Sequence, residues 1–452
     1  MTEETPEPGR KSLLERALTT VADVRPGEGL SVLLMAFTMV LLLGSYYMLK
    51  TVRESLILSE GGAAIKTYSS AGQALLLLVL VPAYGSFASR VNRIALVRWV
   101  TLFFASNIVL FFLLGRAGVR LGIPFFLWVG IFNVMVVAAY WGFANDIYTP
   151  EQGKRLFAIV GLGSNLGAWF GALGAAWLVK QFGPYGLMLT AAVVLAACVL
   201  MAQIVNRKQA RAAPRAAAAA AEKPLGKEGG FELIFKDRYL LLIAALIVVL
   251  NVANTIGEYL LSKMVVAESI ARLGADPASL DARRRFIGAF YGDFFGFVNL
   301  TSFLLQTFAV SRIIKFVGVG GALFFHPVVA FLGYLGMARV PSLGVVEAVK
   351  MADNSIDYSL GNTAKQALWL PTSREAKYKA KQAVDSFFMR AGDVLAAGVV
   401  FVGEHLAFTV PAFAALNVGL ATIWLVIIGR LAPQNRRRMA VAQDPPAREE
   451  GP

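Results

Sequence analysis

The sequence predicts an all-α membrane protein with twelve transmembrane helices in two pseudo-symmetric bundles of six. The 452 residues are 57% hydrophobic and only 16% charged, whereas soluble domains average about 25% charged residues. Apolar stretches of about 20 residues, which is the length that crosses a bilayer, recur along the chain. One charged, alanine-rich stretch divides them into two equal sets.

The twelve apolar segments are separated by short polar connections. They lie near residues 30–49, 66–86, 97–115, 121–143, 155–178, 184–205, 238–262, 286–310, 317–338, 343–368, 380–402 and 408–429. The stretch NRKQARAAPRAAAAAAEKPLGKEGGFE (206–232) is typical of a linker, because it is polar and contains two prolines. The predicted regions are a cytoplasmic N-terminal segment (1–29), a six-helix bundle (30–205), a cytoplasmic linker (206–237), a second six-helix bundle (238–430) and a cytoplasmic tail (431–452).

The positive charge of the chain, +14, agrees with this topology. With both termini in the cytoplasm, the segments on that side hold 28 of the 43 Lys and Arg residues and the outside loops hold 12. Cytoplasmic loops of membrane proteins are enriched in these residues. We therefore expect both termini in the cytoplasm and no nucleic-acid partner. The exception is the run Arg283–Arg285, which this topology places outside.

Residues that carry chemistry in enzymes are scarce. The single cysteine, Cys198, excludes an intrachain disulfide, and the two histidines, His326 and His405, lie far apart in sequence. No Ser-His-Asp or histidine metal site can be assembled from them. We expect no catalytic residue, no metal and no cofactor, and an enzyme is the least supported class.

The polar residues of the first bundle gather at the end of helix 1, in YYMLKTVRES (46–55). Tyr46 and Lys50 are one helical turn apart, and Arg53 follows one turn later. We predict that these side chains bind substrate. The alternative is that Lys50 and Arg53 extend to the membrane interface.

The glycine-rich run GLGSNLGAWFGALG (161–174) in helix 5 superficially resembles a phosphate loop. No strand precedes it and no Gly-Lys-Ser/Thr follows it. Gly163, Gly167 and Gly171 are spaced by four, which predicts close packing against another helix.

The second bundle holds most of the buried charge, and helix 10 carries a polar stripe. Its members recur at spacings of three or four: Glu347, Lys350, Asn354, Asp357, Gly361 and Lys365, with Asp353 beside them. A charged residue at the bilayer centre costs about 2.5–3.5 kcal/mol on insertion scales, so the stripe faces protein or a wet cavity. The alternative is that the charges pair with one another, Lys350 with Glu347 or Asp353, and Asp357 with a neighbouring helix.

Helices 7, 8 and 11 add further polar residues. Helix 7 has Asn251, Asn254 and Glu258 at spacings of three and four, helix 8 has Asp293, and helix 11 has Asp385, Arg390 and Asp393. The predicted substrate-binding residues are Tyr46, Lys50, Arg53, Asn254, Glu258, Lys350, Asn354 and Asp357. The predicted coupling or gating residues are Asp293, Glu347, Asp353, Lys365, Arg390 and Asp393.

The two halves also repeat their basic loops. ASRVNR (88–93) corresponds to VSRIIK (310–315), and DIYTPEQGKR (146–155) to LWLPTSREAK (368–377). Two related six-helix bundles joined by a linker resemble the major facilitator architecture, and GSFASRVNR (85–93) resembles its loop between helices 2 and 3. In such transporters helices 1, 4, 7 and 10 line the central cavity.

Several stretches between about residues 40 and 400 together resemble the ATP/ADP translocase family of plastids and obligate intracellular bacteria. They are YYMLKTVRES (46–55), YWGFANDIYTPEQGKRLFAIVGLGSN (140–165), IGEYLLSKM (256–264), FYGDF (290–294) and AKQALWLPTSREAKYKAKQAVD (364–385). The resemblance implies exchange of nucleotides, or of nucleotide against phosphate, across a bacterial inner (plasma) membrane. It assigns phosphate neutralisation to Lys50 and Arg53 and a functional acid to Glu258. We add Lys350 to the cations.

Two departures from the family pattern concern charge. The helix 4 region FFLWVGIFNVM (125–135) has no acid, and Arg390-Ala391-Gly392-Asp393 ends in an acid where the family has a lysine. Both changes weaken the expectation that ATP itself is the substrate.

We expect a multi-pass antiporter in the lipid bilayer, with ATP/ADP, phosphate or another anionic metabolite as substrate. One alternative is a proton-coupled symporter of a different solute, whose proton carrier is among Glu258, Asp293, Asp357 and Asp393. The response of transport to a pH gradient distinguishes the two. The other alternative is a membrane scaffold or sensor, which has no need of a polar stripe in helix 10.

Overall fold

The computed structural model describes residues 11–20, 22–88, 91–212 and 229–443. Within these ranges the regular structure is entirely helical. Parts of the predicted N-terminal segment (1–10), linker (213–228) and tail (444–452), together with Arg90 of the loop motif, lie outside the described residues.

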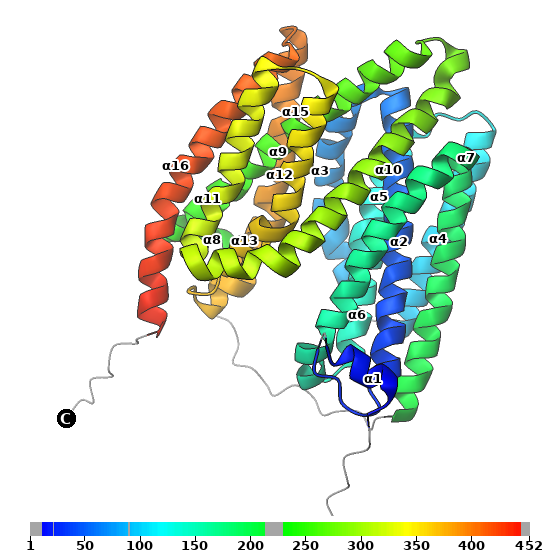
Figure 1. Ribbon diagram of the computed structural model, residues 1–452, viewed down its shortest axis with the longest axis vertical. Coiled ribbons are helices and arrows are strands. Elements are labelled where there is room, and N and C mark those ends of the chain that lie inside the picture. Colours follow the sequence, from blue (N-terminus) through cyan, green and yellow to red (C-terminus); the bar gives the residue numbers. More distant parts are fainter. Residues whose placement is uncertain (1–10, 21, 89–90, 213–228, 444–452) are drawn as a thin grey trace, which may run out of the picture. The chain divides into compact units, whose positions relative to one another are not determined.

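The α-helices are long and consecutive (Figure 1). They are α1 (Leu13–Leu18), α2 (Gly29–Glu60), α3 (Gly62–Ala88), α4 (Arg93–Arg116), α5 (Gly122–Phe132), α6 (Ala138–Ile147), α7 (Pro150–Ala212), α8 (Gly230–Lys236), α9 (Arg238–Leu273), α10 (Leu280–Leu304), α11 (Val310–Arg339), α12 (Leu343–Ile356), α13 (Asn362–Ala367), α14 (Lys381–Ala383), α15 (Met389–His405) and α16 (Val410–Gln443). Short π-helical segments interrupt them at Asn133–Val137, Leu305–Ala309, Asp357–Gly361 (η4), Ala376–Ala380 and Val384–Phe388, and a 3-10 turn spans Pro277–Ser279.

Two of these helices are broken by a glycine with positive φ. Helix α7 changes direction at Gly183 (φ 69°), which precedes Pro184, and α11 does so at Gly318 (φ 70°). A positive φ is easily adopted only by glycine. At 1.5 Å per residue an unbroken 63-residue α7 would be about 95 Å long, roughly three times the hydrocarbon thickness of a bilayer. The break at Gly183 therefore separates two segments of membrane-spanning length within α7.

Nine helical stretches in the described part of the chain are long and apolar enough to cross a membrane. Two of them, Arg155–Lys208 and Pro277–Arg339, contain the breaks at Gly183 and Gly318. Helices α12 and α13, which carry the charged stripe, are not among the nine. The all-helical membrane architecture is as predicted, and the number twelve stays a prediction.

The chain forms two compact units. The first contains residues 1–56, 80–220 and 284–296, and the second contains 57–79, 221–283 and 297–452. The first two thirds of α3 thus belong to the second unit, and the middle of α10 belongs to the first. The predicted boundaries at 30–205 and 238–430 stay a prediction.

The first unit is built on close contact between α7 and α2. A methyl group at Gly163 or Gly167 would clash with the carbonyl oxygens of Ala36 or Val40, and one at Gly171 would lie 2.5 Å from the Cα of Gly44. The predicted packing role of the glycine run is thereby confirmed. Helix α4 packs along α7, and the aromatic rings of Phe104, Phe125, Trp128 and Phe132 fill the space around α5.

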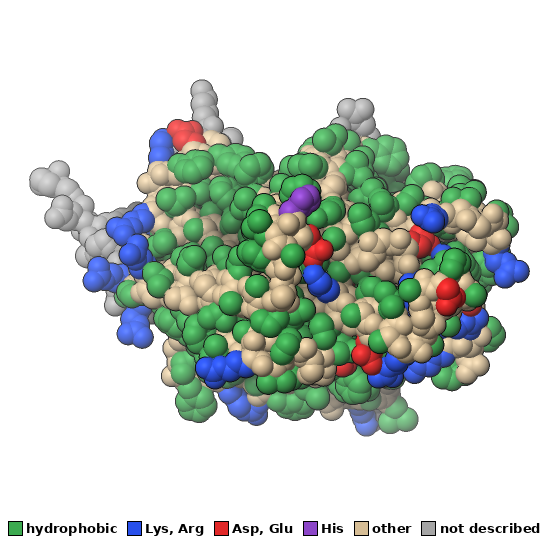
Figure 2. All heavy atoms as spheres, turned by 90° about the horizontal axis from the view of Figure 1, so that it is seen from above, with side chains coloured by type: hydrophobic (Ala, Val, Ile, Leu, Met, Phe, Trp, Pro, Cys, Tyr) green, Lys and Arg blue, Asp and Glu red, His purple; other side chains and the backbone are tan. Residues whose placement is uncertain are grey.

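The second unit is a bundle around α9 and α11. Helix α9 contacts α12, α15 and α16, while α11 contacts α12 and runs beside α16 (Figure 1). Large hydrophobic side chains point outward from both units, among them Phe103, Trp177, Leu332 and Phe401. Hydrophobic side chains cover much of the face seen in Figure 2. This outward arrangement suits a lipid environment rather than water.

Candidate substrate-translocation site

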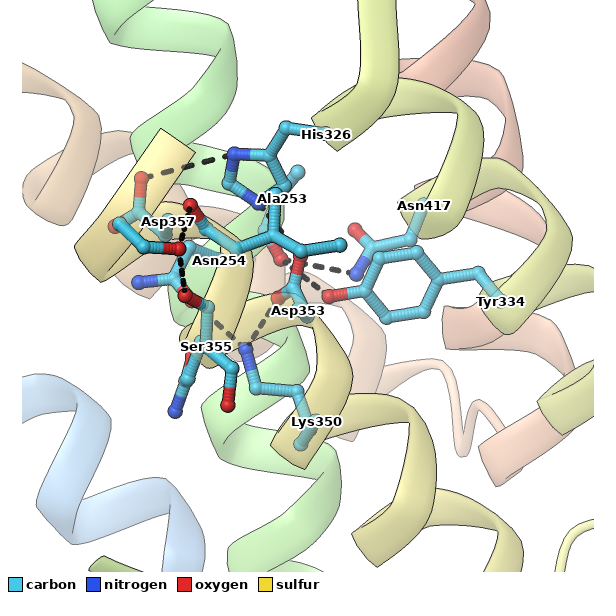
Figure 3. Close-up of polar contacts among 12 residues, drawn as sticks. Ala253, Asn254, His326, Tyr334, Lys350, Asp353, Ser355, Asp357 and Asn417 are labelled. Atoms are coloured by element: carbon cyan, nitrogen blue, oxygen red, sulfur yellow. Dashed lines mark hydrogen bonds and ion pairs between the residues drawn. The ribbon is translucent and has the colours of Figure 1, made fainter. Parts of the chain in front are cut away.

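The second unit encloses a network of charged side chains whose centre is Lys350 on α12 (Figure 3). Its ammonium group donates to Asp353 Oδ2 and to Asn254 Oδ1, each at 2.7 Å. Glu258 Oε1 on α9 lies 3.6 Å away. The Lys350 side chain is 0% exposed. Spacings of three residues place Lys350 and Asp353 on one face of α12, so this helix brings its own counter-ion to the lysine.

His326, on the second half of α11, lies beside the same carboxylate. Its Nε2 is 2.8 Å from Asp353 Oδ1, and its Nδ1 is 3.6 Å from Asp357 Oδ1 (Figure 3). The ring of Trp424 on α16 meets the imidazole edge-on, with centroids 4.6 Å apart. The imidazole therefore lies between two carboxylates with an aromatic ring beside it.

Asp357 begins the π-helical segment η4. Its Oδ1 accepts a hydrogen bond from Lys365 Nζ at 2.8 Å, although eight residues separate the two. The wider π turn shifts the register of the helix. Within η4, a methyl group added to Gly361 would lie 3.2 Å from His326 Nδ1 and 3.4 Å from Asp357 Oδ1. A small residue here leaves room for the imidazole.

The network continues to α3 through Glu258. Glu258 Oε1 accepts from Asn354 Nδ2 at 3.0 Å, and Oε2 lies 3.9 Å from Lys66 Nζ. Lys66 also donates to Ser262 Oγ at 2.9 Å. The sequence of groups from α3 to α13 is therefore Lys66, Glu258, Lys350, Asp353, His326, Asp357 and Lys365.

These contacts balance the charge of the network. It contains three ammonium groups and three carboxylates, and each lysine has a carboxylate within 4.0 Å. Pairing of this kind is what makes buried charge tolerable. The interpretation that stripe charges pair with one another holds for Lys350 and Asp353. Asp357 contacts both His326 of the neighbouring helix α11 and Lys365 of the following helix α13. Glu347 lies one turn before Lys350 and is half-buried.

Helix α9 approaches this network closely at Gly257. A methyl group there would clash with the Tyr334 hydroxyl and lie 3.1 Å from Lys350 Cδ. The Tyr334 hydroxyl and the Asn417 amide both donate to the carbonyl oxygen of Ala253, at 3.3 and 3.0 Å (Figure 3). Helices α11 and α16 are thus held against α9 by hydrogen bonds to one backbone carbonyl.

The chain matches the family model described as TLC ATP/ADP transporter over residues 126–434, which is more than half of its length. The chain belongs to the TLC ATP/ADP transporter family. The matched range contains every residue of the network except Lys66.

Curated relatives agree with this membership. The chain is 23% identical to "ADP,ATP carrier protein 1" of Chlamydia trachomatis over 340 residues, which are 66% of this chain and 62% of that protein. It is 22% identical to the chloroplastic "ADP,ATP carrier protein 2" of Arabidopsis thaliana over 67% of this chain and 52% of that protein. The match thus spans less than two thirds of these relatives.

Solved transporter structures share the fold. A bacterial homologue of the iron transporter ferroportin, in an inward-facing state, has a TM-score of 0.61 at 14% identity and covers 89% of this chain and 98% of its own. A POT family transporter in complex with 5-aminolevulinic acid has the same TM-score at 14% identity, with coverage of 90% and 96%. Both are transporters, and the predicted major facilitator fold of a multi-pass membrane protein is confirmed.

At Asp393 this TLC family chain has an acid where the family pattern has a lysine. The structure shows which side chains contact this acid. Its Oδ1 accepts from Asn251 Nδ2 at 2.8 Å and from Thr255 Oγ1 at 3.2 Å, and its Oδ2 lies 3.4 Å from Arg390. A methyl group at Gly392 would lie 2.8 Å from Asn251 Cβ. The reversed charge is neutralised locally, so it does not disturb the network around Lys350.

In the first unit, the predicted residues of α2 lie among aromatic rings. Lys50 Nζ is 4.0 Å from the centroid of Phe295, and Tyr46 stacks on Phe132 with centroids 6.3 Å apart. Arg53 donates from Nε to Glu54 at 3.0 Å and lies over Phe126, and its side chain is 14% exposed.

Asp293 differs from the other predicted residues because its side chain is 48% exposed and lies 3.6 Å from Lys180 Nζ. The roles assigned to all these residues from the sequence stay predictions.

Sequence reasoning overlooked two members of the network. The sequence pattern assigns no role to His326 or to Lys66, because His326 lies far from the other histidine and Lys66 lies at the start of an apolar segment. His326 follows ten apolar or glycine residues (316–325) and precedes Pro327, a position that could have marked it as buried. Among the described residues, no group of histidine, cysteine or acid side chains is suited to hold a metal.

Proposed function

We propose that this protein is a membrane antiporter, and not an enzyme, that exchanges ATP for ADP or a related phosphorylated anion by alternating access. The observation that carries the proposal is the family match over residues 126–434, a range that includes the buried charges of α9, α11, α12 and η4. The names of the chlamydial and chloroplastic relatives support adenine nucleotides as the substrate class.

Within this proposal the cations have different tasks. Lys350 is fully buried and bound by Asp353 and Asn254, so it orders the second unit rather than meeting phosphate in the described conformation. Lys50 and Arg53 in the first unit are the proposed phosphate contacts, because charge-assisted bonds from cations to phosphate are strong. Tyr46 is the proposed aromatic contact for the base.

The remaining residues predicted from the sequence complete the proposed path. Asn254, Glu258, Asn354 and Asp357 are proposed to contact substrate, and Asp293, Glu347, Asp353, Lys365, Arg390 and Asp393 to couple or gate its movement. The polar stripe supports this division, because membrane-embedded charges commonly mark substrate pathways.

We also propose a bacterial inner (plasma) membrane location with both termini in the cytoplasm. The chlamydial relatives support a bacterial membrane. The excess of Lys and Arg in the predicted inside segments supports the orientation.

The test is uptake of labelled ATP into proteoliposomes that contain the purified protein, with and without ADP trapped inside. Exchange requires internal ADP. Lys350→Ala and Glu258→Ala should abolish uptake, whereas Lys236→Ala in α8 should leave it unchanged. Absence of uptake by correctly inserted wild-type protein would contradict nucleotide exchange. Wild-type rates in both network variants would contradict the assignment of the path.

A further inference from the structure

The imidazole of His326 is in an unusual electrostatic position. The residue is 5% exposed, and Nδ1 has no hydrogen-bond partner within the described structure. Nδ1 lies 3.6 Å from Asp357 Oδ1, while Nε2 is 2.8 Å from Asp353 Oδ1 (Figure 3). Each ring nitrogen therefore faces a carboxylate oxygen.

The short contact determines which nitrogen carries the proton in the neutral ring. An ionised carboxylate can only accept, so Nε2 carries a hydrogen that it donates to Asp353. Nδ1 then presents a lone pair to Asp357 Oδ1, which is another acceptor. Two acceptors therefore face each other across 3.6 Å. A proton on Nδ1 would convert this repulsion into an N–H···O hydrogen bond.

The groups around His326 leave a place for this extra positive charge. Asp353 and Lys350 face it from α12, Asp357 from η4 and Lys365 from α13, with Glu258 of α9 beyond Lys350. Helix α16 contributes the uncharged ring of Trp424. Because the ammonium and carboxylate groups of the network balance, a protonated His326 would give it one net positive charge.

We propose that Nδ1 of His326 is a proton-binding site, and that proton binding promotes binding of the anionic substrate through Lys365. A proton from the medium forms the Nδ1–H bond, and no other covalent bond changes. The imidazolium competes with Lys365 for the same atom, Asp357 Oδ1, which Lys365 now holds at 2.8 Å. Released from Asp357, the Lys365 ammonium, whose side chain is 19% exposed, pairs with an anionic group of the substrate.

The proton returns to the medium when the anion leaves and Lys365 pairs with Asp357 again. Coupling between two ligands is reciprocal, so bound anion must also favour the protonated ring. The identity of the anion rests on the proposed function, whereas the proton site does not.

The presence of only two histidines, His326 and His405, allows a direct measurement. Imidazole resonances of 15N-histidine-labelled protein in detergent are followed from pH 5 to 8.5, with His405→Gln used for assignment. Histidine side chains ordinarily change charge in this range. We expect the His326 signal to change with pH, and Asp357→Asn to lower the midpoint of that change, since a facing carboxylate favours the cation. Asp385→Asn, which removes a partly exposed carboxylate, is the matched control and should leave the midpoint unchanged.

The coupling is measured by adding ATP, and inorganic phosphate in a parallel titration. ATP should raise the His326 midpoint, and ATP affinity should be about fivefold higher at pH 6 than at pH 8. In His326→Gln this pH dependence should vanish while ATP still binds. A His326 signal that does not titrate, or a midpoint indifferent to Asp357→Asn, overturns the proton site.

A titrating His326 whose midpoint does not respond to any bound anion overturns the coupling. Failure of the proposed function looks different. In that case ATP neither binds nor exchanges at any pH, while the titration and its dependence on Asp357 are intact and phosphate alone raises the midpoint.

Discussion

The pair formed by Lys350 and Asp353 offers a quantitative test of the buried network. The perturbation is Asp353→Asn, which keeps the shape of the side chain and an oxygen that accepts from His326, but removes the negative charge. The variant leaves the Lys350 ammonium, which is 0% exposed, with Asn254 at 2.7 Å and Glu258 at 3.6 Å.

Removing one member of a buried ion pair typically costs about 3–5 kcal/mol, because the other charge stays desolvated. Glu258 remains close enough to compensate in part, so we expect a loss at the lower end, about 3 kcal/mol in the free energy of unfolding. Lys350→Met should cost a similar amount. The double variant should lose much less than the two single losses together, with a coupling energy of about 2–3 kcal/mol.

The assay is equilibrium unfolding of the purified protein in detergent micelles, carried out as a double-mutant cycle. The control cycle uses Glu232 and Lys236 of α8, which pair at 2.7 Å but have side chains 51% and 58% exposed. Exposed helical pairs contribute about 0.3–0.5 kcal/mol. If Asp353→Asn costs less than about 1 kcal/mol, or if the two cycles give equal coupling, mutual neutralisation of Lys350 and Asp353 is refuted.

Two further predictions concern the first unit. Gly167→Ala should destabilise the first unit by about 1–3 kcal/mol, because the new methyl group meets the Val40 carbonyl of α2. The control is Gly174→Ala, where nothing lies within 4 Å of the added methyl group. Equal unfolding midpoints for the two variants would contradict the packing of α7 against α2. Both carboxylate oxygens of Glu28 accept hydrogen bonds from Arg155, at 2.9 and 3.0 Å. Burial raises the pKa of Glu28, but hydrogen bonds from Arg155, the Arg25 backbone and Gln152 outweigh burial. The pKa is therefore lowered from 4.5. A lowered pKa stabilises the fold above the unfolded pKa, and that contribution is lost as the pH falls through the folded value. Glu28→Gln should therefore destabilise the protein at pH 7, and its difference from wild type should shrink as the pH falls below 4.5. A constant difference from pH 7 to pH 3.5 would show that Glu28 does not act through its charge.

The sequence was sufficient for features that depend on local spacing. Membrane helices are visible as long apolar runs, and the contact of Gly163, Gly167 and Gly171 with α2 follows from a spacing of four. The stripe along helix 10 was visible for the same reason, because residues three or four apart share a helix face. Family membership was also predictable, since its motifs are short continuous stretches.

The pairing of the buried charges required the tertiary structure. Spacing alone left Glu347 and Asp353 as equal partners for Lys350, and only the packing of α12 against α9 and α11 selects Asp353. The contact between Asp357 and Lys365 depends on the π-helical turn at η4, which no periodic pattern predicts.

His326 shows this division most clearly. Its residue type and its apolar neighbours are properties of the sequence. Its two facing carboxylates come from α12, which begins 17 residues later at Leu343, and from the η4 segment that follows α12. The sequence by itself determined that this is a helical membrane protein of a nucleotide-transporter family with charge buried in its second half. Tertiary structure alone decided which charges lie together across helices and which carboxylates face the two imidazole nitrogens, because no single-helix periodicity records the distance between helices.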